Sequence, residues 1–378
     1  MKILHICNDF AGSKVYVNLV KKMDDIGINQ IIYCPVRNKF SVGKNQFIGN
    51  NIDFYYSLCI KSWYKLVYHY KAFRLYNDMK KNVDIRSIDL IHAHTLFSDG
   101  FLAYKAYMEF GIPYVVAVRN TDVNDFIRLM KHCYYAGRKI LLNAEKIYFI
   151  SSALQEKLAK SNFVKPILDK VKDKFVLQPN GIDDYWHGHI SHDERKGHDV
   201  LYVGDFSANK NVVRLAEAVL GLRKEDGFND LRLKIVGGEV KGGGRRNDGK
   251  TQSMIDAYPD AIMALGKIYD KDILSEVMHS CSVFAMPSIY ETFGLVYLEA
   301  LSQNLPVIYT NGQGIDGLFD DTVGIGVNPL SVEDIKDAIK IILQNNSKYG
   351  NKNVHFEDFD WSEIAGKYIG MYKDIITK

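Results

Sequence analysis

Two glutamates with a fixed spacing are the residues of this chain whose types and positions most suggest chemistry. Glu291 and Glu299 are separated by seven residues, which begin with a short turn and continue into a helix-forming run. The free N–H groups of Gly294, Leu295 and Val296 at the start of that helix would face an anion, most naturally a phosphate. The two carboxylates, one just outside the helix start and one further along it, could accept hydrogen bonds from two groups of hydroxyls. A ligand that fits this arrangement has an anionic centre with hydroxyl-bearing groups on both sides, as a nucleotide-diphosphate sugar does.

The elements around the glutamates must place them at one edge of a sheet. Residues 282–286 predict a short buried strand that is stopped by Pro287, and residues 306–309 predict the next strand. In a unit of strand, loop, helix and strand, the loop and the helix start lie at the carboxyl edge of a parallel sheet, where open α/β folds bind ligands. The alternative is that the two glutamates belong to a solvated helix face.

The stretch PSIYETFGLVYLEALSQNLPVI resembles the signature of family-4 glycosyltransferases, which are retaining enzymes of the GT-B fold. Further matches run in order along nearly the whole chain. The resemblance implies an α/β chain of two doubly wound, Rossmann-like domains that face each other across a cleft. It also implies a nucleotide-sugar co-substrate, with UDP as the expected nucleotide, and no cofactor. In that family pattern Glu291 positions the transferring sugar and Glu299 holds the ribose.

A lysine further upstream completes the expected anion-binding set. Residues 199–204 predict a strand, and the loop after it runs from Asp205 to Lys210. The loop resembles a family motif in which a glycine and an arginine are followed, after four residues, by a lysine, and both cations hold the diphosphate. Lys210 matches the lysine, although exposed lysines before helices are common, and Asp205 stands in place of the arginine. The candidates to replace the missing charge are Arg119, Arg245 and Arg246.

Two further loops are expected beside the donor. The first predicted strand is followed by a loop with Ala11-Gly12 where the family has a glycine pair, and the absence of GxGxxG favours a sugar or phosphate over NAD. Ile268 lies in a segment similar to the one whose backbone meets the nucleobase. By the resemblance, the residues expected to bind the donor are Gly12, Lys210, Ile268, Glu291, Phe293, Gly294, Leu295 and Glu299. The residues expected to take part in catalysis are Glu291, Lys210 and His94.

A His-x-His pair ends the predicted strand at residues 88–94. His92 and His94 share one face because alternate residues of a strand point the same way, so two imidazoles could hold a metal ion. A third ligand at a fitting spacing is not evident, and we therefore predict no metal site. The segment resembles the family's His-Ala-His, whose second histidine lines the cleft, and this implies the same position for His94.

The carboxyl end of the predicted strand 113–118 is the expected acceptor side. Relatives often have a His-Asp pair here, near the acceptor and the transferring sugar, whereas this chain has Arg119-Asn120. The resemblance therefore gives no role directly. The side chains that could contact acceptor or donor are Arg119, Asp122 and Asn124.

Length and composition indicate a globular protein of two domains. The chain has 378 residues, of which 47% are hydrophobic and 25% charged. No apolar run reaches the roughly eighteen residues that a membrane span needs, and the first apolar residues are too few for a signal peptide, so we expect a cytoplasmic protein. The five cysteines are scattered without CxxC spacing, which argues against a disulfide framework and a structural zinc site.

Charge divides the chain in two. Residues 1–180 hold 27 Lys and Arg against 15 Asp and Glu, a net charge of +12, whereas the rest has a net charge of −9. We predict a boundary near Asn180, where PNGID resembles the family's interdomain crossing. The predicted domains are 1–180, which binds the acceptor, and 181–362, which binds the nucleotide-sugar, with the last helix, about 363–378, packing back on the first domain. The positive first half suggests an anionic partner.

The segment from Ser57 to Lys81 combines aromatic and basic residues. An aromatic and apolar stripe recurs there at helical spacing, at Trp63, Val67, Tyr70, Phe73 and Tyr76. Either this stripe packs on the sheet, or the helix lies at an anionic membrane surface, where each basic residue contributes about 1 kcal/mol. No motif for reading nucleic acid is present.

These features predict a retaining, metal-independent glycosyltransferase of the hexosyltransferase type. It would move a sugar from a nucleotide-diphosphate sugar to a glycan or lipid-linked acceptor in surface polysaccharide synthesis. Two Asp-x-Asp strings, 270–272 and 358–360, are expected to open or precede helices and not to hold a metal-bound diphosphate. Two alternatives share the fold, a sugar-nucleotide 2-epimerase and a catalytically silent partner subunit. We expect no cofactor, no nucleic-acid partner, and a location in the cytoplasm or at the inner face of the membrane.

Overall fold

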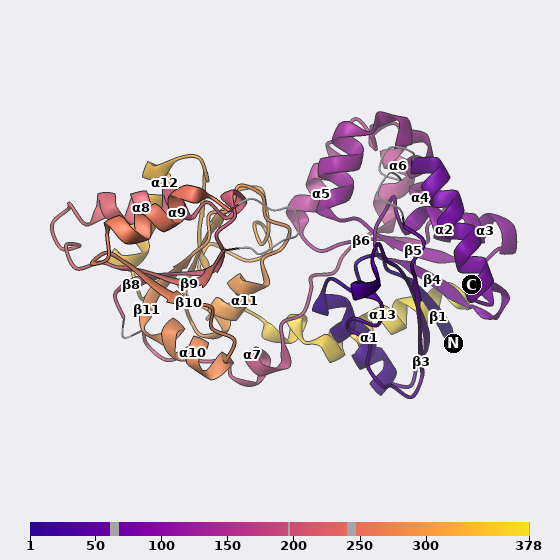
Figure 1. Cartoon of the computed structure of the whole chain (residues 1–378), viewed down its shortest axis with the longest axis horizontal. Coiled ribbons are helices and arrows are strands. Elements are labelled where there is room, and N and C mark those ends of the chain that lie inside the picture. Colours follow the sequence, from indigo (N-terminus) through magenta and orange to yellow (C-terminus); the bar gives the residue numbers. More distant parts are fainter. Residues whose placement is uncertain (61–67, 196, 240–246, 378) are drawn as a thin grey trace. The chain divides into compact units, whose positions relative to one another are not determined.

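The computed structural model describes residues 1–60, 68–195, 197–239 and 247–377, and its contacts divide the chain into two compact units (Figure 1). Unit 1 consists of Met1–Ile150, Leu154–Gly181 and Glu357–Lys378. Unit 2 consists of Ser151–Ala153 and Ile182–Phe356. The passage from unit 1 to unit 2 at Gly181 lies next to the boundary predicted near Asn180.

Unit 1 is built on a seven-stranded parallel sheet with the order β3-β2-β1-β4-β5-β6-β7. Its inner strands β4 and β5 are buried along their whole length, as expected for a parallel sheet covered on both faces. The strands are β1 (Lys2–Ile6), β2 (Asn29–Pro35), β3 (Ile52–Ser57), β4 (Leu90–Ala93), β5 (Tyr114–Ala117), β6 (Lys146–Phe149) and β7 (Phe175–Leu177). The helices before the crossing are α1 (Lys14–Asp25), α2 (Tyr68–Asn82), α3 (Gly100–Phe110), α4 (Tyr134–Asn143), α5 (Ser152–Ala159) and α6 (Leu168–Val171).

Unit 2 is built on a six-stranded parallel sheet with the order β10-β9-β8-β11-β12-β13. Its strands are β8 (Asp199–Asp205), β9 (Leu233–Gly238), β10 (Ile262–Gly266), β11 (Cys281–Ala285), β12 (Val307–Thr310) and β13 (Gly324–Val327). Its helices are α7 (Asp184–Gly188), α8 (Val212–Leu222), α9 (Gly249–Ala257), α10 (Lys271–His279), α11 (Leu295–Ser302) and α12 (Val332–Gln344). In both sheets the order of strands reverses between the first and fourth strands, which is the switch point of a doubly wound fold.

The last helix, α13 (Trp361–Ile376), belongs to unit 1. Its apolar face, which includes Ile364 and Tyr372, lies in one buried cluster with Ile3 of β1 and Leu19 of α1. The C-terminal end of the chain therefore completes the core of the unit that the N-terminal end begins.

Both Asp-x-Asp strings lie at helix starts, as predicted. Asp270 Oδ1 accepts hydrogen bonds from the backbone N–H groups of Asp272 and Ile273 at 2.9 and 3.2 Å, and so caps α10. Asp360 caps α13 in the same way, through Ser362 and Glu363. These carboxylates stabilise helix N-termini.

The strands β3, β10 and β13, which the sequence did not predict, lie at sheet edges. An edge strand pairs on one side only and remains partly exposed. The residues of β3 are accordingly half-buried or exposed, without the continuous apolar run that marks an inner strand.

The aromatic stripe of residues 57–81 does not form one buried face. Tyr76 is buried on α2, but Tyr70 and Phe73 are 48% and 53% exposed, so packing of the whole stripe on the sheet is wrong for these two residues. Trp63 and Val67 lie outside the described residues. No helix in the described ranges combines the length and the apolar character that crossing a membrane requires.

Candidate active site

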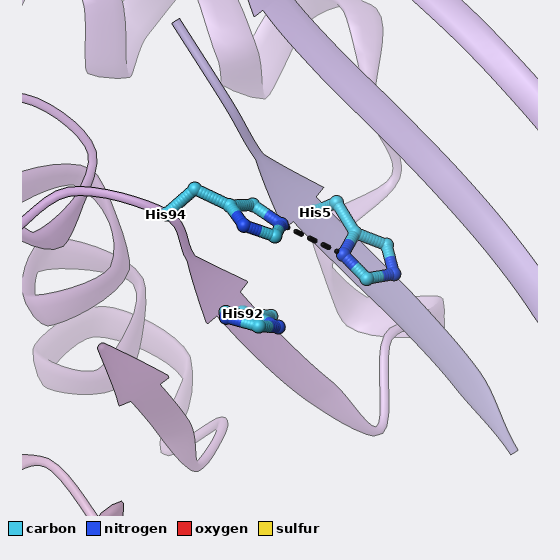
Figure 2. A group of neighbouring side chains, drawn as sticks. All are labelled: His5, His92 and His94. Carbon is cyan, nitrogen blue, oxygen red and sulfur yellow. Dashed lines mark hydrogen bonds between the residues drawn. The ribbon is translucent and has the colours of Figure 1, made fainter. Parts of the chain in front are cut away.

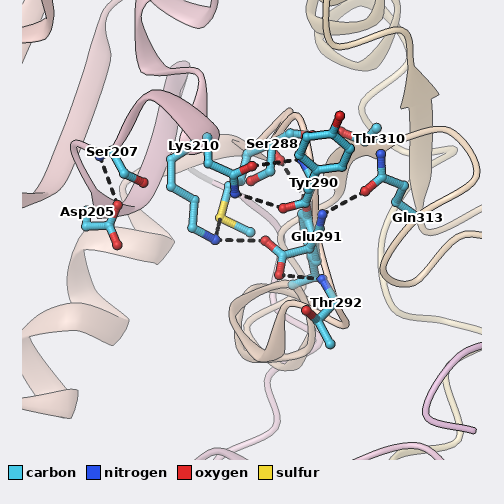
Figure 3. A network of polar contacts seen from close by, with 12 residues as sticks. Asp205, Ser207, Lys210, Ser288, Tyr290, Glu291, Thr292, Thr310 and Gln313 are labelled. Carbon is cyan, nitrogen blue, oxygen red and sulfur yellow. Dashed lines mark hydrogen bonds and ion pairs between the residues drawn. The ribbon is translucent and has the colours of Figure 1, made fainter. Parts of the chain in front are cut away.

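The two residues that carry most of the predicted donor chemistry meet in unit 2. Lys210 follows β8 and Glu291 follows β11, so both lie at the carboxyl edge of the sheet, on either side of its switch point. Lys210 Nζ is 2.7 Å from Glu291 Oε2, and the two side chains are only 19% and 11% exposed (Figure 3). A ligand that arrives here therefore meets an ion pair and not a lone cation.

Two further side chains, those of Asn209 and Gln313, hydrogen-bond to the segment that contains Glu291. Asn209 Oδ1 accepts from the N–H of Tyr290 at 3.0 Å, and Asn209 Nδ2 donates to the Tyr290 carbonyl at 2.8 Å. On the other side, Gln313 Oε1 accepts from the N–H of Glu291 and Gln313 Nε2 donates to the carbonyl of Ile289, both at 2.8 Å. The signal for Asn209 in the sequence is its place in the predicted loop from Asp205 to Lys210, whereas Gln313 lies in the loop after β12, between two glycines.

Helix α11 begins where the sequence predicted, at Leu295, directly after Gly294. Gly294 has φ 79°, and a Cβ there would lie 2.5 Å from the Tyr297 ring, so the tight entry to the helix requires glycine. The Tyr297 hydroxyl donates to the carbonyl of Met286 at 2.6 Å and ties the helix to the end of β11. Phe293 is 2% exposed, so its ring belongs to the core.

Glu299 lies in the middle of α11, half-buried and near the ion pair between Lys271 and Asp183. Burial and the charge of Asp183 raise the pKa of Glu299 to about 7, although Lys271 acts in the opposite direction. A carboxyl with this pKa changes its charge near neutral pH, and with it its capacity to accept hydrogen bonds from hydroxyls. Ile268 follows β10, at the carboxyl edge of the same sheet.

Asp205 shapes the loop after β8 and supplies no positive charge. Its Oδ1 accepts from the N–H of Ser207 at 2.9 Å (Figure 3). Two of the proposed replacements for the missing arginine, Arg245 and Arg246, lie outside the described residues. Lys210 is therefore the one cation between the end of β8 and the start of α8.

Three histidines lie together at the switch point of unit 1 (Figure 2). His5 of β1 is the register partner of His92 of β4, and His94 follows the end of β4. His5 Nδ1 lies 3.0 Å from His94 Nε2, and the rings of His92 and His94 stack with centroids 4.0 Å apart and 20° between their planes. The third histidine that was not evident in the sequence is thus His5, on the neighbouring strand.

The stacking of these rings argues against one shared metal ion. Their ring nitrogens come within 4.8 Å of one another, which by distance alone would permit a metal site. An ion, however, binds in the plane of each imidazole at about 2.1 Å, and two nearly parallel stacked rings cannot both direct a lone pair at it. Burial lowers the pKa of His5 to about 3 and the pKa values of His92 and His94 well below the usual range, so all three rings are neutral.

The backbone carbonyl of His94 holds the side chain of Arg119 in place. Its ring is 1% exposed, whereas its carbonyl oxygen accepts from Arg119 Nε at 3.1 Å. The Arg119 guanidinium lies over the ring of Tyr16, 5.7 Å from the centroid, at the carboxyl end of β5. Within the described part of the chain, its two terminal nitrogens have no hydrogen-bond partner. Burial raises the pKa of the Asp9 carboxyl, and the positive charge of the planar Arg119 fork acts to lower it. The predicted role of His94 itself stays a prediction.

Asp122 has a structural task that the sequence did not predict. Its carboxylate is 1% exposed and accepts from the backbone N–H groups of Leu96, Phe97 and Arg119 at 3.0, 3.1 and 2.9 Å. Burial raises the pKa of Asp122 to about 6, while these hydrogen bonds act to lower it. Asp122 thus joins the loops after β4 and β5, and its oxygens are engaged by the protein itself.

The remaining predicted residues of unit 1, Gly12 and Asn124, lie in the loops after β1 and β5. A Cβ at Gly12 would lie 2.4 Å from Asp9 Oδ1, so this glycine makes room for the Asp9 side chain. Asn124 Oδ1 accepts from Lys157 Nζ at 2.7 Å and lies in the π-helical turn Asp122–Ile127, a kind of turn that is frequent at functional sites.

Comparison with known families matches both halves of the chain. Residues 12–185 match the family described as Glycosyltransferase Family 4, and residues 189–356 match the family described as Glycosyl transferases group 1. Together the two matches cover most of both units.

Among similar proteins, an uncharacterized glycosyltransferase of Methanocaldococcus jannaschii is 23% identical over 95% of this chain and 93% of its own length. The putative teichuronic acid biosynthesis glycosyltransferase TuaC of Bacillus subtilis is 25% identical over 66% of this chain and 60% of its own length.

Solved structures share the fold over the whole chain. Sucrose-phosphate synthase of Thermosynechococcus elongatus superposes with a TM-score of 0.73 at 17% identity, covering 100% of this chain and 99% of that chain. Anabaena HepE in complex with UDP and glucose has a TM-score of 0.69 at 16% identity. The superposition covers 99% of this chain and 100% of that chain. With its two doubly wound parallel sheets and both family matches, this chain belongs to the family-4, group 1 glycosyltransferases and has the GT-B fold.

Proposed function

We propose that this glycosyltransferase transfers a sugar, with retention of configuration and without a metal ion, from a UDP-sugar to a glycan or lipid-linked acceptor in surface polysaccharide synthesis. The observation that carries the proposal is the contact of Lys210 with Glu291 beside the start of α11. A cation, free helix N–H groups and a carboxylate then lie within one small region of unit 2. A diphosphate that carries a sugar needs this combination.

The chemistry assigned to this site is stabilisation of a leaving diphosphate. As the bond between the anomeric carbon and the phosphate oxygen breaks, its electron pair passes to the diphosphate. The acceptor oxygen forms the new bond on the same face of the sugar and passes its proton to the leaving diphosphate. Lys210 and the N–H groups of Gly294 and Leu295 would stabilise the developing charge. Glu291 would hold sugar hydroxyls and Glu299 the ribose.

The acceptor is proposed to be anionic and to bind unit 1. The support is the net charge of +12 in residues 1–180 and the Arg119 fork, which the His94 carbonyl and the Tyr16 ring hold in place. Two names among the similar proteins support a polysaccharide product at the cell surface: one relative is named for teichuronic acid biosynthesis, and one solved structure is a lipopolysaccharide outer core galactosyltransferase.

Contact with an anionic membrane surface is part of the same proposal. The exposed aromatic side chains of Tyr70 and Phe73 on α2, beside the exposed Arg74, support it. Sedimentation with anionic liposomes at low ionic strength tests it, and binding that salt does not weaken, or no binding at all, would contradict it.

The test of the proposed function is a screen of nucleotide-sugars for thermal stabilisation and slow hydrolysis. A UDP-sugar should raise the melting temperature and release UDP, with transfer when a glycan acceptor is added. Stabilisation by no nucleotide-sugar would overturn the proposal.

Asp205 favours one alternative, a catalytically silent subunit that stabilises an active partner. Such a subunit would lack turnover even where it retained the fold. Release of UDP from a UDP-sugar by the purified chain, lost in the Lys210→Met variant, excludes this alternative. The epimerase alternative would instead convert the sugar without releasing UDP.

A further inference from the structure

The loop between β2 and β3, residues 36–51, exposes large apolar side chains to solvent. Ile48 is fully exposed and Phe40 is 95% exposed, the highest values among the large apolar side chains of the described residues, and Val42 is 49% exposed. Single exposed apolar residues are common on protein surfaces, but three within nine positions of one loop indicate a surface that contacts an apolar partner.

Hydrogen bonds hold this loop in one shape, so the exposure of its apolar side chains is a property of the fold. Asn45, with φ 66°, donates through its Nδ2 to the carbonyl of Phe10 at 2.8 Å. The hydroxyl of Tyr56 on β3 donates to the carbonyl of Lys44. The ring of Phe47 packs against a buried cluster of unit 1. The loop is therefore fixed to unit 1 on its inner side while its outer apolar side chains face water.

The charge of the loop indicates what kind of partner fits it. Residues 36–51 contain three basic side chains and no acidic one, and all three are exposed: Arg37, Lys39 and Lys44. Lys21 of α1 lies over the ring of Phe47, 5.2 Å from its centroid, and adds a fourth cation. The nearby carboxylate of Asp24 accepts from two backbone N–H groups at the end of the loop, but this residue is only 8% exposed.

Apolar side chains among exposed cations fit an anionic lipid surface. The interfacial region of a bilayer accepts the apolar side chains, and the lipid phosphates attract the basic ones. A second copy of this chain, docked loop to loop, would instead bring like charges together. The composition of the loop therefore favours anionic lipid over a second copy.

The position of the loop connects it with the expected acceptor side. It begins directly after Pro35, at the carboxyl end of β2, and through Asn45 it contacts the loop after β1, which contains Gly12. Arg119 follows β5 at the same edge of the sheet. A partner bound to the loop therefore lies close to the edge of unit 1 at which the acceptor is proposed to bind.

We propose that residues 36–51 form a membrane contact of unit 1, in which Phe40 and Ile48 enter the interfacial region of an anionic bilayer. The basic side chains of the loop bind lipid phosphates. The inference rests on the proposed function, which supplies a lipid-linked acceptor as the reason for membrane contact, and it adds a contact separate from α2. Binding at this loop brings the carboxyl edge of the unit 1 sheet to the surface where such an acceptor presents its sugar.

The test is sedimentation of the full chain with vesicles of phosphatidylglycerol and phosphatidylcholine, compared with vesicles of phosphatidylcholine alone. Phe40→Ser and Ile48→Ser should each lower binding to the anionic vesicles by roughly threefold or more, because each removes an apolar side chain that leaves water. The matched control is Leu330→Ser, which removes an apolar side chain that is 61% exposed on unit 2 and should bind like the wild type.

The contribution of charge is measured separately. Lys39→Gln and Lys44→Gln should each lower binding by roughly fivefold at low ionic strength, and these losses should shrink as salt is added. The losses in Phe40→Ser and Ile48→Ser should persist in salt. Equal binding of the wild type to both kinds of vesicle would overturn the role assigned to the basic side chains, and with it the inference.

Three other outcomes overturn the inference and identify what replaces it. Wild-type binding in both serine variants, with a loss only in Phe73→Ser, would assign the membrane contact to α2 alone. A changed oligomeric state of Phe40→Ser in light scattering without vesicles would show that a second copy covers the loop. No vesicle binding by the wild type would remove membrane contact altogether.

The proposed transfer activity is checked independently of the membrane. Release of UDP from a UDP-sugar in solution should be equal in the wild type, Phe40→Ser and Ile48→Ser, because the loop belongs to unit 1 and the donor is proposed to bind unit 2. A wild type that binds vesicles through the loop but releases no UDP contradicts the proposed function and supports the membrane contact. Normal release of UDP without vesicle binding overturns this inference alone.

Discussion

The switch points of the two units share one topology and use their polar residues differently. In unit 1 the polar side chains at the switch point, His5, His92 and His94, are buried and neutral, and the backbone carbonyl of His94 accepts a hydrogen bond from Arg119, which follows β5. In unit 2 the corresponding loops carry Lys210 and Glu291, a charged and partly accessible pair. The same strand order therefore brings polar, potentially reactive side chains to the carboxyl edge of each sheet. The burial of these side chains decides whether they support the backbone or can contact a ligand.

The largest expected effect is that of Lys210→Met, which removes the cation proposed to stabilise the leaving diphosphate. Loss of one such group typically lowers turnover by about 10²- to 10³-fold. The matched control is Lys234→Met, because Lys234 is also paired with a carboxylate, Asp199 at 3.0 Å, and precedes the middle of β9, away from the loops of the site. Steady-state transfer rates should fall only for Lys210→Met. Equal losses of transfer rate in the two variants would mean that the ion pair between Lys210 and Glu291 only stabilises the fold.

The next effect is on nucleotide affinity. If Glu299 accepts hydrogen bonds from the ribose, Glu299→Gln removes a bond to a charged group worth about 1.5–3 kcal/mol, which corresponds to a loss of roughly tenfold or more in UDP affinity. Calorimetry measures it, with Glu217→Gln on the exposed side of α8 as the control. An unchanged affinity would leave Glu299 without a role in binding the nucleotide.

For unit 1 the comparison predicts that a change beside the buried histidines lowers the free energy of unfolding and leaves turnover nearly unchanged. Tyr372→Phe removes the hydroxyl that lies 2.6 Å from His92 Nδ1 in the core. The unpaired nitrogen should lower the free energy of unfolding by about 1–3 kcal/mol, measured by urea denaturation, with turnover nearly unchanged. Tyr76→Phe, whose hydroxyl contacts the more exposed Glu109 at 2.8 Å, should cost less. A large loss of turnover with normal stability would show instead that the histidine cluster takes part in the reaction.

The smallest predicted effect is a dependence of UDP binding on pH. Burial raises the pKa of Glu299 to about 7, so below that pH the carboxyl is mostly protonated and offers the ribose hydroxyls an uncharged, weaker acceptor. UDP affinity should therefore rise as the pH increases through 7 and level off above it, by about threefold between pH 6 and pH 8, which is less than the loss expected for Glu299→Gln. Glu299→Gln should remove this rise of UDP affinity with pH and leave only the pH dependence that comes from titration of the UDP phosphate. An equal slope in both proteins would assign the pH dependence to the nucleotide.

The sequence predicted the inner strands and the start of α11 because their signals are local. Buried parallel strands such as β5 are continuous apolar runs, and the glycine before Leu295 marks a helix entry. The edge strands β3 and β13 lack that signal. Their partial exposure gives them no clear pattern.

Contacts between distant segments could not be predicted in the same way. His5 meets His92 only through the register of β1 with β4, and Lys210 meets Glu291 across 81 positions of the chain. Asp122 was predicted to contact a substrate, and only the structure reveals that three backbone N–H groups occupy it. The types of residue at the site can be predicted from the sequence, but the residues they contact depend on strand order and register.

Hydrogen–deuterium exchange with and without UDP tests the central claim most directly, because it locates the nucleotide without assuming which residue binds it. If unit 2 holds the diphosphate at Lys210 and the start of α11, UDP should slow exchange in the segments 205–212 and 289–297, and this protection should be lost in Lys210→Met. Protection confined to unit 1, or protection of these segments that survives Lys210→Met at full size, would contradict the account.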